Sequence, residues 1–201
     1  MSRRNSAAGH PHQGDQIRAQ IAHTAARLMA EDGVSDFALA KRKALRQLGL
    51  PDSHPLPGNA DIEEALKTYQ AIYLADEQPA QLHLLREEAV KLMRLLAPFR
   101  PYLTGSVLDG TAGRYSDIDL QLFADSAKEV EIFLLNKGIE FAHETPRNDR
   151  AEAVFVVEND NATAHLVVYG PDDERIALKT RDGRPRDRAR LEAVEALLAA
   201  G

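Results

Sequence analysis

Residues 103–123 read LTGSVLDGTAGRYSDIDLQLF, which predicts a strand, a turn that contains glycine, and a second strand that carries two aspartates. Asp117 and Asp119 are separated by one residue, so in a strand their side chains lie on the same face. The apolar residues that alternate with them then face the core: Ile118, Leu120 and Leu122. Neighbouring carboxylates repel one another unless a cation lies between them, and Asp is uncommon in strands. The pattern therefore favours a cation site over a simple turn capped by Ser116 and Asp117.

The turn before the aspartates predicts a contact with phosphate. Gly105 and Ser106 end the first strand and offer backbone N–H groups and a small hydroxyl. Mg²⁺ takes hard oxygen ligands, often one or two carboxylates together with substrate phosphates. A carboxylate pair beside such a turn is typical of sites for phosphoryl or nucleotidyl transfer.

These residues resemble the signature of the nucleotidyltransferase superfamily, in which Gly-Ser is followed by a short variable turn and then Asp-x-Asp. Small bacterial members often read G-S-x-A-R-G and later S-D-I-D-L. The matching residues of this chain are Gly105, Ser106, Gly110, Ser116, Asp117, Ile118, Asp119 and Leu120. The spacing from Ser106 to Asp117 also agrees with that pattern. The chain departs from it at Leu108 and Asp109, where small residues and Arg are common.

The resemblance implies an enzyme that moves a nucleoside monophosphate from a nucleoside triphosphate, such as ATP, to an acceptor hydroxyl. Asp117 and Asp119 would be catalytic and would hold Mg²⁺ or Mn²⁺. Gly105, Ser106 and Ser116 would bind the nucleotide. The acceptor stays open between a tRNA, a protein and a small molecule. The alternatives are a non-catalytic module of the same fold that binds a nucleotide or RNA, and a component of a toxin–antitoxin pair.

The third carboxylate of that superfamily falls, in this alignment, on His165 within the segment AHLVVYG. Histidine is a poorer ligand for Mg²⁺ than a carboxylate. We expect His165 to lie near the two aspartates, as a metal ligand, as a base for the attacking hydroxyl, or as a packed histidine in an inactive relative. Glu152 or Glu158 would supply the missing oxygen if the strand register differs by a few residues.

An arginine-rich segment precedes the C-terminus, with five arginines and two aspartates between residues 181 and 190. Arginine binds phosphate through a planar pair of N–H groups. Arg181, Arg184 and Arg186 are therefore candidates for binding the nucleotide, and a solvent-exposed loop is the equally weighted alternative. Arg188 and Arg190 are expected to begin a helix. The residues that this helix would bury are Leu191, Val194, Leu197 and Leu198.

The predicted fold class is α+β, with an N-terminal helical region followed by a small mixed sheet that has helices on one side. We expect a disordered tail at residues 1–13, the helical region at 15–97, and a nucleotidyltransferase-like domain with a C-terminal helix at 98–201. In that domain the patterns predict a helix at 126–136 and strands at 139–144, 153–158 and 163–169.

Composition narrows the possible partners. The net charge of −6 argues against broad binding to nucleic acid and against a stable DNA complex. For the helix expected at 36–48, a solvated basic face is favoured over a helix-turn-helix. The absence of cysteine excludes disulfides and thiolate zinc sites. With no apolar run of membrane-spanning length and no signal-peptide pattern, we expect a cytoplasmic protein without a membrane partner.

Overall fold

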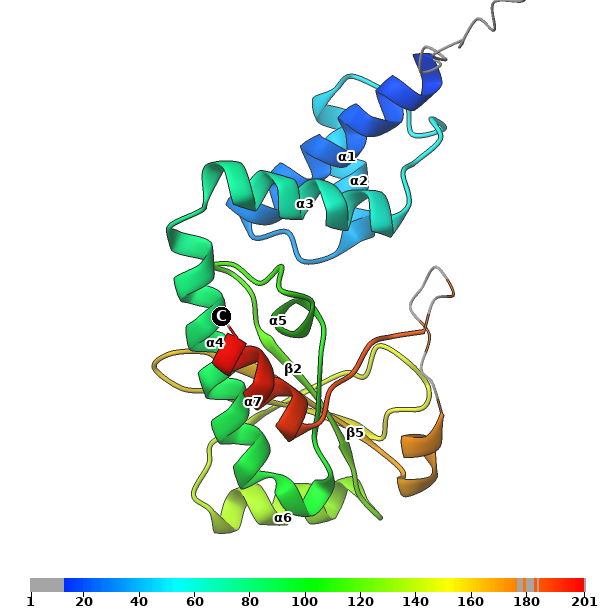
Figure 1. Ribbon diagram of the computed structural model, residues 1–201. Coiled ribbons are helices and arrows are strands. Elements are labelled where there is room, and N and C mark those ends of the chain that lie inside the picture. Colours follow the sequence, from blue (N-terminus) through cyan, green and yellow to red (C-terminus); the bar gives the residue numbers. More distant parts are fainter. Residues whose placement is uncertain (1–12, 177–178, 180–182, 184, 201) are drawn as a thin grey trace, which may run out of the picture. The chain divides into compact units, whose positions relative to one another are not determined.

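The computed structural model describes residues 13–176, 179, 183 and 185–200 (Figure 1). The chain divides into two compact units between Tyr69 and Gln70. The expected tail lies outside the described residues except for Gln13, where the first helix begins. Within the described part, no helix has the length and apolarity needed to cross a membrane.

The N-terminal unit is helical, as expected. Its helices are α1 (Gln13–Asp32), α2 (Phe37–Gln47) and the greater part of α3 (Asn59–Tyr73). Asp36 caps α2 by accepting a hydrogen bond of 2.7 Å from the Leu39 N–H. Gly33 and Gly49, each with a φ of 67°, follow the ends of α1 and α2. The core of this unit is rich in alanine, which allows the helices to approach closely: Ile21, Ala22, Ala25, Ala26, Leu28, Val34, Ala40, Ala44, Leu45, Ile62, Ala65 and Leu66.

The C-terminal unit combines helices with a sheet. Its helical segments are α4 (Glu77–Leu95), η1 (Ala97–Phe99), α5 (Ser106–Asp109), α6 (Ala127–Asn136), η2 (Pro171–Arg175) and α7 (Leu191–Ala200). Its strands are β1 (Tyr102–Thr104), β2 (Ile118–Phe123), β3 (Ala142–Glu144), β4 (Ala153–Glu158) and β5 (Thr163–Tyr169). Strands β4 and β5 have the expected bounds and form an antiparallel hairpin.

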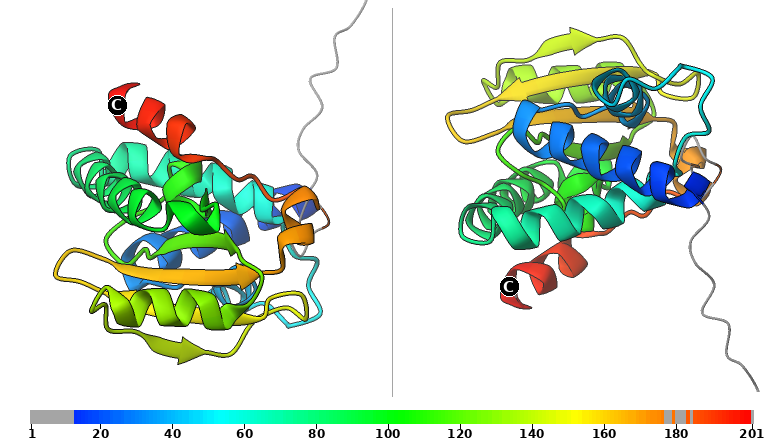
Figure 2. Two further views of the ribbon diagram at one scale, coloured as in Figure 1. Left: turned by 90° about the horizontal axis from the view of Figure 1, so that it is seen from below. Right: turned by 90° about the horizontal axis from the view of Figure 1, so that it is seen from above.

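The strands form one five-stranded mixed sheet in the order β1-β2-β5-β4-β3. The central pair, β2 and β5, is parallel, and the other neighbours are antiparallel (Figure 2). This arrangement confirms the α+β class and the small mixed sheet. It also agrees with the fold that the nucleotidyltransferase resemblance implies.

One face of the sheet carries the main hydrophobic core. Ile118, Leu120 and Leu122 of β2 are fully buried there, as the alternation of the sequence predicts. Four helices, α4, α5, α6 and α7, bury side chains in the same core, among them Met93 of α4 and Val194 of α7. Helices α4 and α7 lie next to one another and are joined by an ion pair of 2.6 Å between Arg94 and Glu195 (Figures 1 and 2). The opposite face of β2 and β5 carries the polar residues of the candidate site.

Helix α4 belongs with the sheet. Its buried residues Leu85, Ala89, Val90 and Met93 pack in the core that the strands form. The sequence-based boundary at residues 97–98 would separate this apolar face from its partners, whereas the contacts divide the chain at Tyr69. A helical period alone does not tell which unit covers the apolar face of a helix.

Three local expectations differ from the structure. Strand β3 is shorter than the predicted strand at 139–144, and one helical turn, α5, forms after Gly105. Arg188 and Arg190 do not begin the last helix, because α7 starts at Leu191. The backbone of Ala189 instead makes two hydrogen bonds of 2.9 Å with Leu103, which holds this segment in an extended bridge along β1.

Candidate metal and nucleotide site

The turn between β1 and α5 is fitted closely to Asp119. Thr104, the last residue of β1, pairs with Asp119 across the antiparallel ladder. Gly105 follows with φ 75° and ψ −158°, a conformation essentially limited to glycine. A Cβ atom at this position would lie 2.7 Å from Asp119 Oδ2. Gly105 therefore allows the carboxylate to approach the turn, as a site between Gly-Ser and Asp-x-Asp requires.

The two aspartates lie at the start of β2, on the face opposite the core. Asp117 directly precedes the strand and Asp119 lies within it, so the two share a face as predicted. Burial raises the pKa of Asp119, and the negative charge of Asp117 raises it further. The positive charges of Arg186, His165 and Arg147 act in the opposite direction. A cation bound here would offset the cost of holding a partly buried carboxylate ionised.

His165 lies beside the aspartates. It pairs with Asp119 in the parallel register of β2 and β5. Its Nε2 atom lies 3.3 Å from Asp117 Oδ2, and its Nδ1 atom lies 3.0 Å from Glu144 Oε2. The expected proximity of His165 to the aspartates is thus present in the structure. Its role as ligand or base stays a prediction.

The surroundings of His165 favour its protonated form. The hydrogen bond with Asp117 raises the pKa of His165, burial lowers it, and the charges of Asp117, Asp119 and Glu144 raise it further. An imidazolium donates from both ring nitrogens, which suits a ring placed between two carboxylates. Only the neutral ring can bind a metal or accept a proton, so either role requires His165 to lose this proton.

Glu144 also lies at the site, although the sequence did not predict it there. It lies on β3, and the ladders through β4 place it on the same face as His165. Of the two glutamates proposed instead, Glu152 accepts a hydrogen bond of 3.0 Å from Ala127 N. Glu158, the last residue of β4, pairs with Thr163 on the same face as His165, and its role stays a prediction. No local pattern marks Glu144, because only the strand order brings β3 toward the site.

Polar side chains fix the loop between α5 and β2 that leads to Asp117. Gln78 Nε2 donates to the carbonyls of Gly110 and Ala112, at 3.1 and 2.8 Å. The buried Gln70 donates to the Thr111 carbonyl at 2.8 Å. Ser116 Oγ accepts a hydrogen bond of 3.0 Å from Gly113 N, which closes the turn before Asp117. Ser116 therefore shapes the loop, and its contact with a nucleotide stays a prediction.

The expected arginines are only partly described. Arg181 and Arg184 lie outside the described residues. Arg186 lies close enough to Asp119 for its charge to lower the pKa of that carboxyl, second in effect only to burial. We call residues 185–190 the C-terminal strap. Its placement brings one of the three predicted arginines toward the aspartates.

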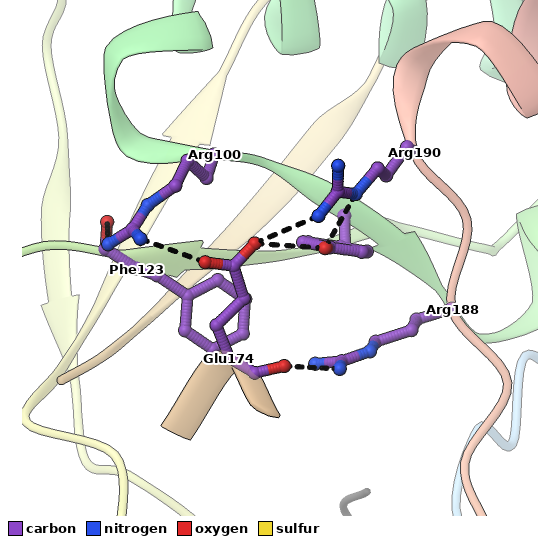
Figure 3. Close-up of polar contacts among 6 residues, drawn as sticks. Arg100, Phe123, Glu174, Arg188 and Arg190 are labelled. Carbon is purple, nitrogen blue, oxygen red and sulfur yellow. Dashed lines mark hydrogen bonds and ion pairs between the residues drawn. The ribbon is translucent and has the colours of Figure 1, made fainter. Parts of the chain in front are cut away.

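The strap is anchored at an arginine cluster around Glu174 (Figure 3). The carboxylate of Glu174 accepts hydrogen bonds from Arg100 at 2.8 Å, from Tyr102 at 3.0 Å and from Arg190 at 3.2 Å. Arg188 reaches the same residue, but its guanidinium donates to the backbone carbonyl of Glu174. These contacts hold the strap on the face of β1 that also carries the site.

The oxygen atoms at this site suit a hard divalent cation whose remaining ligands come from water and a substrate. Asp117 and Asp119 offer carboxylate oxygens on one face, and Gly105 leaves room beside the second of them. Among the described residues, no group of three or more His, Asp or Glu side chains is arranged to hold a metal ion. Mg²⁺ commonly takes one or two carboxylates and fills its remaining positions with water and phosphate, so a pair is compatible with it.

Comparison with known proteins identifies no close relative. No family model and no curated protein matches the chain. Among solved structures, the crystal structure of the Cid1 poly(U) polymerase is similar over 43% of this chain and 30% of that chain, with 18% sequence identity and a TM-score of 0.33. The matched region is thus less than a third of the polymerase. At this identity and TM-score, the likeness establishes neither a shared reaction nor a shared substrate.

Proposed function

We propose that this protein is a metal-dependent nucleotidyltransferase that moves a nucleoside monophosphate from a nucleoside triphosphate to an acceptor hydroxyl. The proposal rests chiefly on one observation: Asp117 and Asp119 share a face of β2, with the Asp119 carboxylate against the Gly105 turn. The G-S and S-D-I-D-L residues of the sequence support the same reaction. The acceptor remains a tRNA, a protein or a small molecule.

In this proposal the residues of the site divide the work. Asp117 and Asp119 hold Mg²⁺ or Mn²⁺, which when bound stabilises charge on the attacking and leaving oxygens. Gly105 and Ser106 orient the triphosphate at the turn after β1. Arg186 supplies positive charge near Asp119, where phosphates would otherwise meet a carboxylate pair.

A second candidate function is a non-catalytic module that binds a nucleotide or RNA. The observation that favours it is His165, which stands where the superfamily usually has a carboxylate and pairs with both Asp117 and Glu144. A protonated His165 supplies positive charge of its own between these carboxylates. In a relative that no longer binds a metal, this positive charge would offset the repulsion between the carboxylates and so preserve the fold.

The transfer reaction is tested with each labelled nucleoside triphosphate, Mg²⁺ or Mn²⁺, and a cell extract as the source of acceptors. Label should enter one class of molecule, and Asp117→Asn or Asp119→Asn should remove at least about 99% of that transfer, as expected for a lost metal ligand. Asp125→Asn removes an exposed carboxylate beyond the other end of β2 and should leave transfer unchanged. Equal labelling by all three variants would exclude the paired-carboxylate site.

Metal binding separates the two candidate functions. Calorimetry with Mg²⁺ and a nonhydrolysable triphosphate should show binding that Asp117→Asn and Asp119→Asn each abolish, if the enzyme proposal holds. His165→Asp restores the usual third carboxylate. A non-catalytic relative should gain Mg²⁺ affinity from this change, because a further carboxylate strengthens the site once a cation is bound. An enzyme that uses His165 should instead lose its native reaction.

A further inference from the structure

Gln121 is a buried amide that the protein leaves without a hydrogen bond. It lies on β2 two residues after Asp119, so both side chains lie on the same face of the sheet. Gln121 is 2% exposed, and neither its Nε2 nor its Oε1 atom has a hydrogen-bond partner among the described residues. Buried amides are nearly always paired, because leaving one unpaired costs free energy. The unpaired amide therefore needs a physical explanation.

Arg188, near the Tyr102 ring, also has a buried nitrogen without a hydrogen-bond partner in the described part of the chain. Its guanidinium lies 4.7 Å from the centre of the Tyr102 ring and 5.8 Å from that of Phe123. One terminal nitrogen, Nη2, donates to the Glu174 carbonyl, while Nη1 is buried without a partner (Figure 3). No ion pair joins Arg188 to a carboxylate among the described residues, and the Glu174 carboxylate is bound by other side chains.

The two unpaired groups border the same aromatic side chain. Gln121 pairs with Tyr102 across β1 and β2, which places their side chains next to each other on one face. Ala189 pairs with Leu103, so Arg188 projects to the opposite face, where Tyr102 lies. Gln121 and the Arg188 guanidinium thus flank Tyr102. A small ligand near this ring would meet an amide N–H and a cationic N–H.

A phosphate group fits these donors better than a neutral molecule does. A water molecule would satisfy the Gln121 amide but would leave the Arg188 charge unneutralised. A phosphate oxygen accepts from both donors and carries the opposite charge. Asp119 lies two residues away, about 7 Å along a strand, which is within the span of a triphosphate.

We propose that Gln121 and Arg188 form a subsite for a phosphate group, beneath the C-terminal strap and next to the carboxylate pair. This inference deepens the proposed function, because a nucleoside triphosphate is one source of the phosphate group, and free phosphate is the other. Gln121 is almost fully covered, so entry of the ligand requires a small displacement of the strap around Arg188.

The test uses inorganic phosphate as the probe, in calorimetry of the full chain without metal. Gln121→Leu and Arg188→Gln should each weaken phosphate binding at least about tenfold, the effect of losing one hydrogen bond to a charged ligand. Arg94→Gln is the matched control, since it also removes one positive charge but from the exposed pair with Glu195. Its phosphate affinity should stay within about twofold of the parent's.

Stability measurements separate this role from a structural one. Replacing an unpaired buried amide by an apolar residue of similar shape leaves a fold equally or more stable. Gln121→Leu should therefore keep its unfolding midpoint in urea while losing phosphate affinity, and a purely structural Gln121 would show no loss of affinity. The inference is overturned if the parent protein binds no phosphate at millimolar concentration, or if both folded variants bind it as the parent does.

Two further measurements identify the source of the phosphate and distinguish the subsite proposal from the proposed function. Competition between phosphate and a nonhydrolysable triphosphate assigns the subsite to the substrate, whereas simultaneous binding assigns it to free phosphate. Asp117→Asn should abolish transfer yet retain metal-free phosphate binding. Phosphate binding without any transferase activity would contradict only the proposed function. Transfer that is indifferent to Gln121→Leu and Arg188→Gln would contradict only the assignment of the subsite to the substrate.

Discussion

At the scale of single residues, the site depends on residues whose burial or backbone conformation costs free energy. Asp119 is ionised only against the effect of burial, which raises its pKa. Gly105 accepts a conformation that other residues avoid, and this lets the Asp119 carboxylate lie against the turn. Strain and desolvation of this kind are typical of functional sites.

Gly105→Ala should damage the site more than the fold. The added Cβ would meet Asp119 Oδ2 at 2.7 Å and hold alanine at a φ of 75°, which costs about 1–3 kcal/mol of stability. Displacement of the carboxylate should weaken Mg²⁺ binding at least about tenfold in calorimetry. Gly138→Ala is the control, because Gly138 also has a positive φ, 67°, but nothing lies within 4 Å of an added Cβ. That variant should lose about 1–2 kcal/mol in urea denaturation and keep its metal affinity. Equal metal affinity in both variants would contradict the close fit.

His165 should make stability depend on pH in the metal-free protein. Its folded-state pKa is raised above the ordinary value of 6.5, chiefly by the hydrogen bond with Asp117. Protonated His165 therefore stabilises the folded protein fully below pH 6.5, and this stabilisation is lost as pH rises through the folded-state pKa. His165→Asn should cost more stability in urea denaturation at about pH 5.5 than at about pH 8.5. A difference independent of pH would show that the ring is held by packing alone.

The protonation of His165 also predicts how the transfer activity depends on pH. A metal ligand or a base needs the neutral ring, so transfer by the parent protein should fall as pH decreases. A bound cation opposes the neighbouring carboxylates, which favour the protonated ring, so the midpoint of this fall should move to lower pH as the Mn²⁺ concentration rises. A rate profile in Mn²⁺ measures this midpoint, and His165→Asn should remove that limb if the ring takes part. A midpoint that does not change with the Mn²⁺ concentration would contradict a place for the ring beside the metal.

At the scale of elements, a buried carboxylate ties α4 to the hairpin of β4 and β5. Glu88 is 6% exposed and accepts hydrogen bonds from Lys91 at 2.7 Å, from Asn159 at 3.1 Å and from Asn161 at 3.2 Å. The Lys91 hydrogen bond lowers the pKa of Glu88, burial raises it, and the two asparagines lower it further. The hairpin in turn positions His165 on β5.

Glu88→Ala should destabilise the protein by about 1–2 kcal/mol, because it removes the buried charged acceptor that holds two exposed asparagine side chains to α4. The folded-state pKa of Glu88 is lowered below its ordinary value of 4.5. The Glu88 carboxylate therefore stabilises the protein above pH 4.5, and this stabilisation is lost as pH falls through the folded-state pKa. Glu88→Gln should remove this part of the acid dependence, as measured by urea denaturation between about pH 3 and about pH 6. Coupling is tested by combining Glu88→Ala with Asn161→Ala, and strictly additive losses would show that the two side chains do not interact.

At the scale of the molecule, the sheet and its helices form a unit that includes α4. The core of this unit contains Leu85, Ala89 and Met93, and Gln70 and Gln78 hold the loop before β2. A fragment of residues 70–201 should therefore unfold cooperatively and bind Mg²⁺ as the full chain does. A fragment of residues 98–201, which follows the sequence-based boundary, should lack stable structure because its core loses the α4 face. Circular dichroism during thermal unfolding distinguishes the two, and cooperative folding of the shorter fragment would contradict this assignment.

Local sequence predicted many of the elements and the shared face of the two aspartates, although β3, α5 and the start of α7 differ from the expectation. The alternation around Asp117 and Asp119 predicted both the face of β2 and its buried residues, because the period of a strand is a local property. The bounds of β4 and β5 followed from local residue patterns for the same reason. The sequence placed Gly105 in the turn, whereas its φ of 75° and its close fit to Asp119 came from the structure.

Tertiary structure alone decided which distant residues meet at that centre. Glu144 reaches His165 only because β3 joins the sheet beside β4, and the pairing of Ala189 with Leu103 turns Arg188 toward Tyr102 and Gln121. The assignment of α4 to the sheet likewise depends on which apolar surface covers it. Strand order and packing partners arise from contacts between residues far apart in the chain, and a local period carries no information about them.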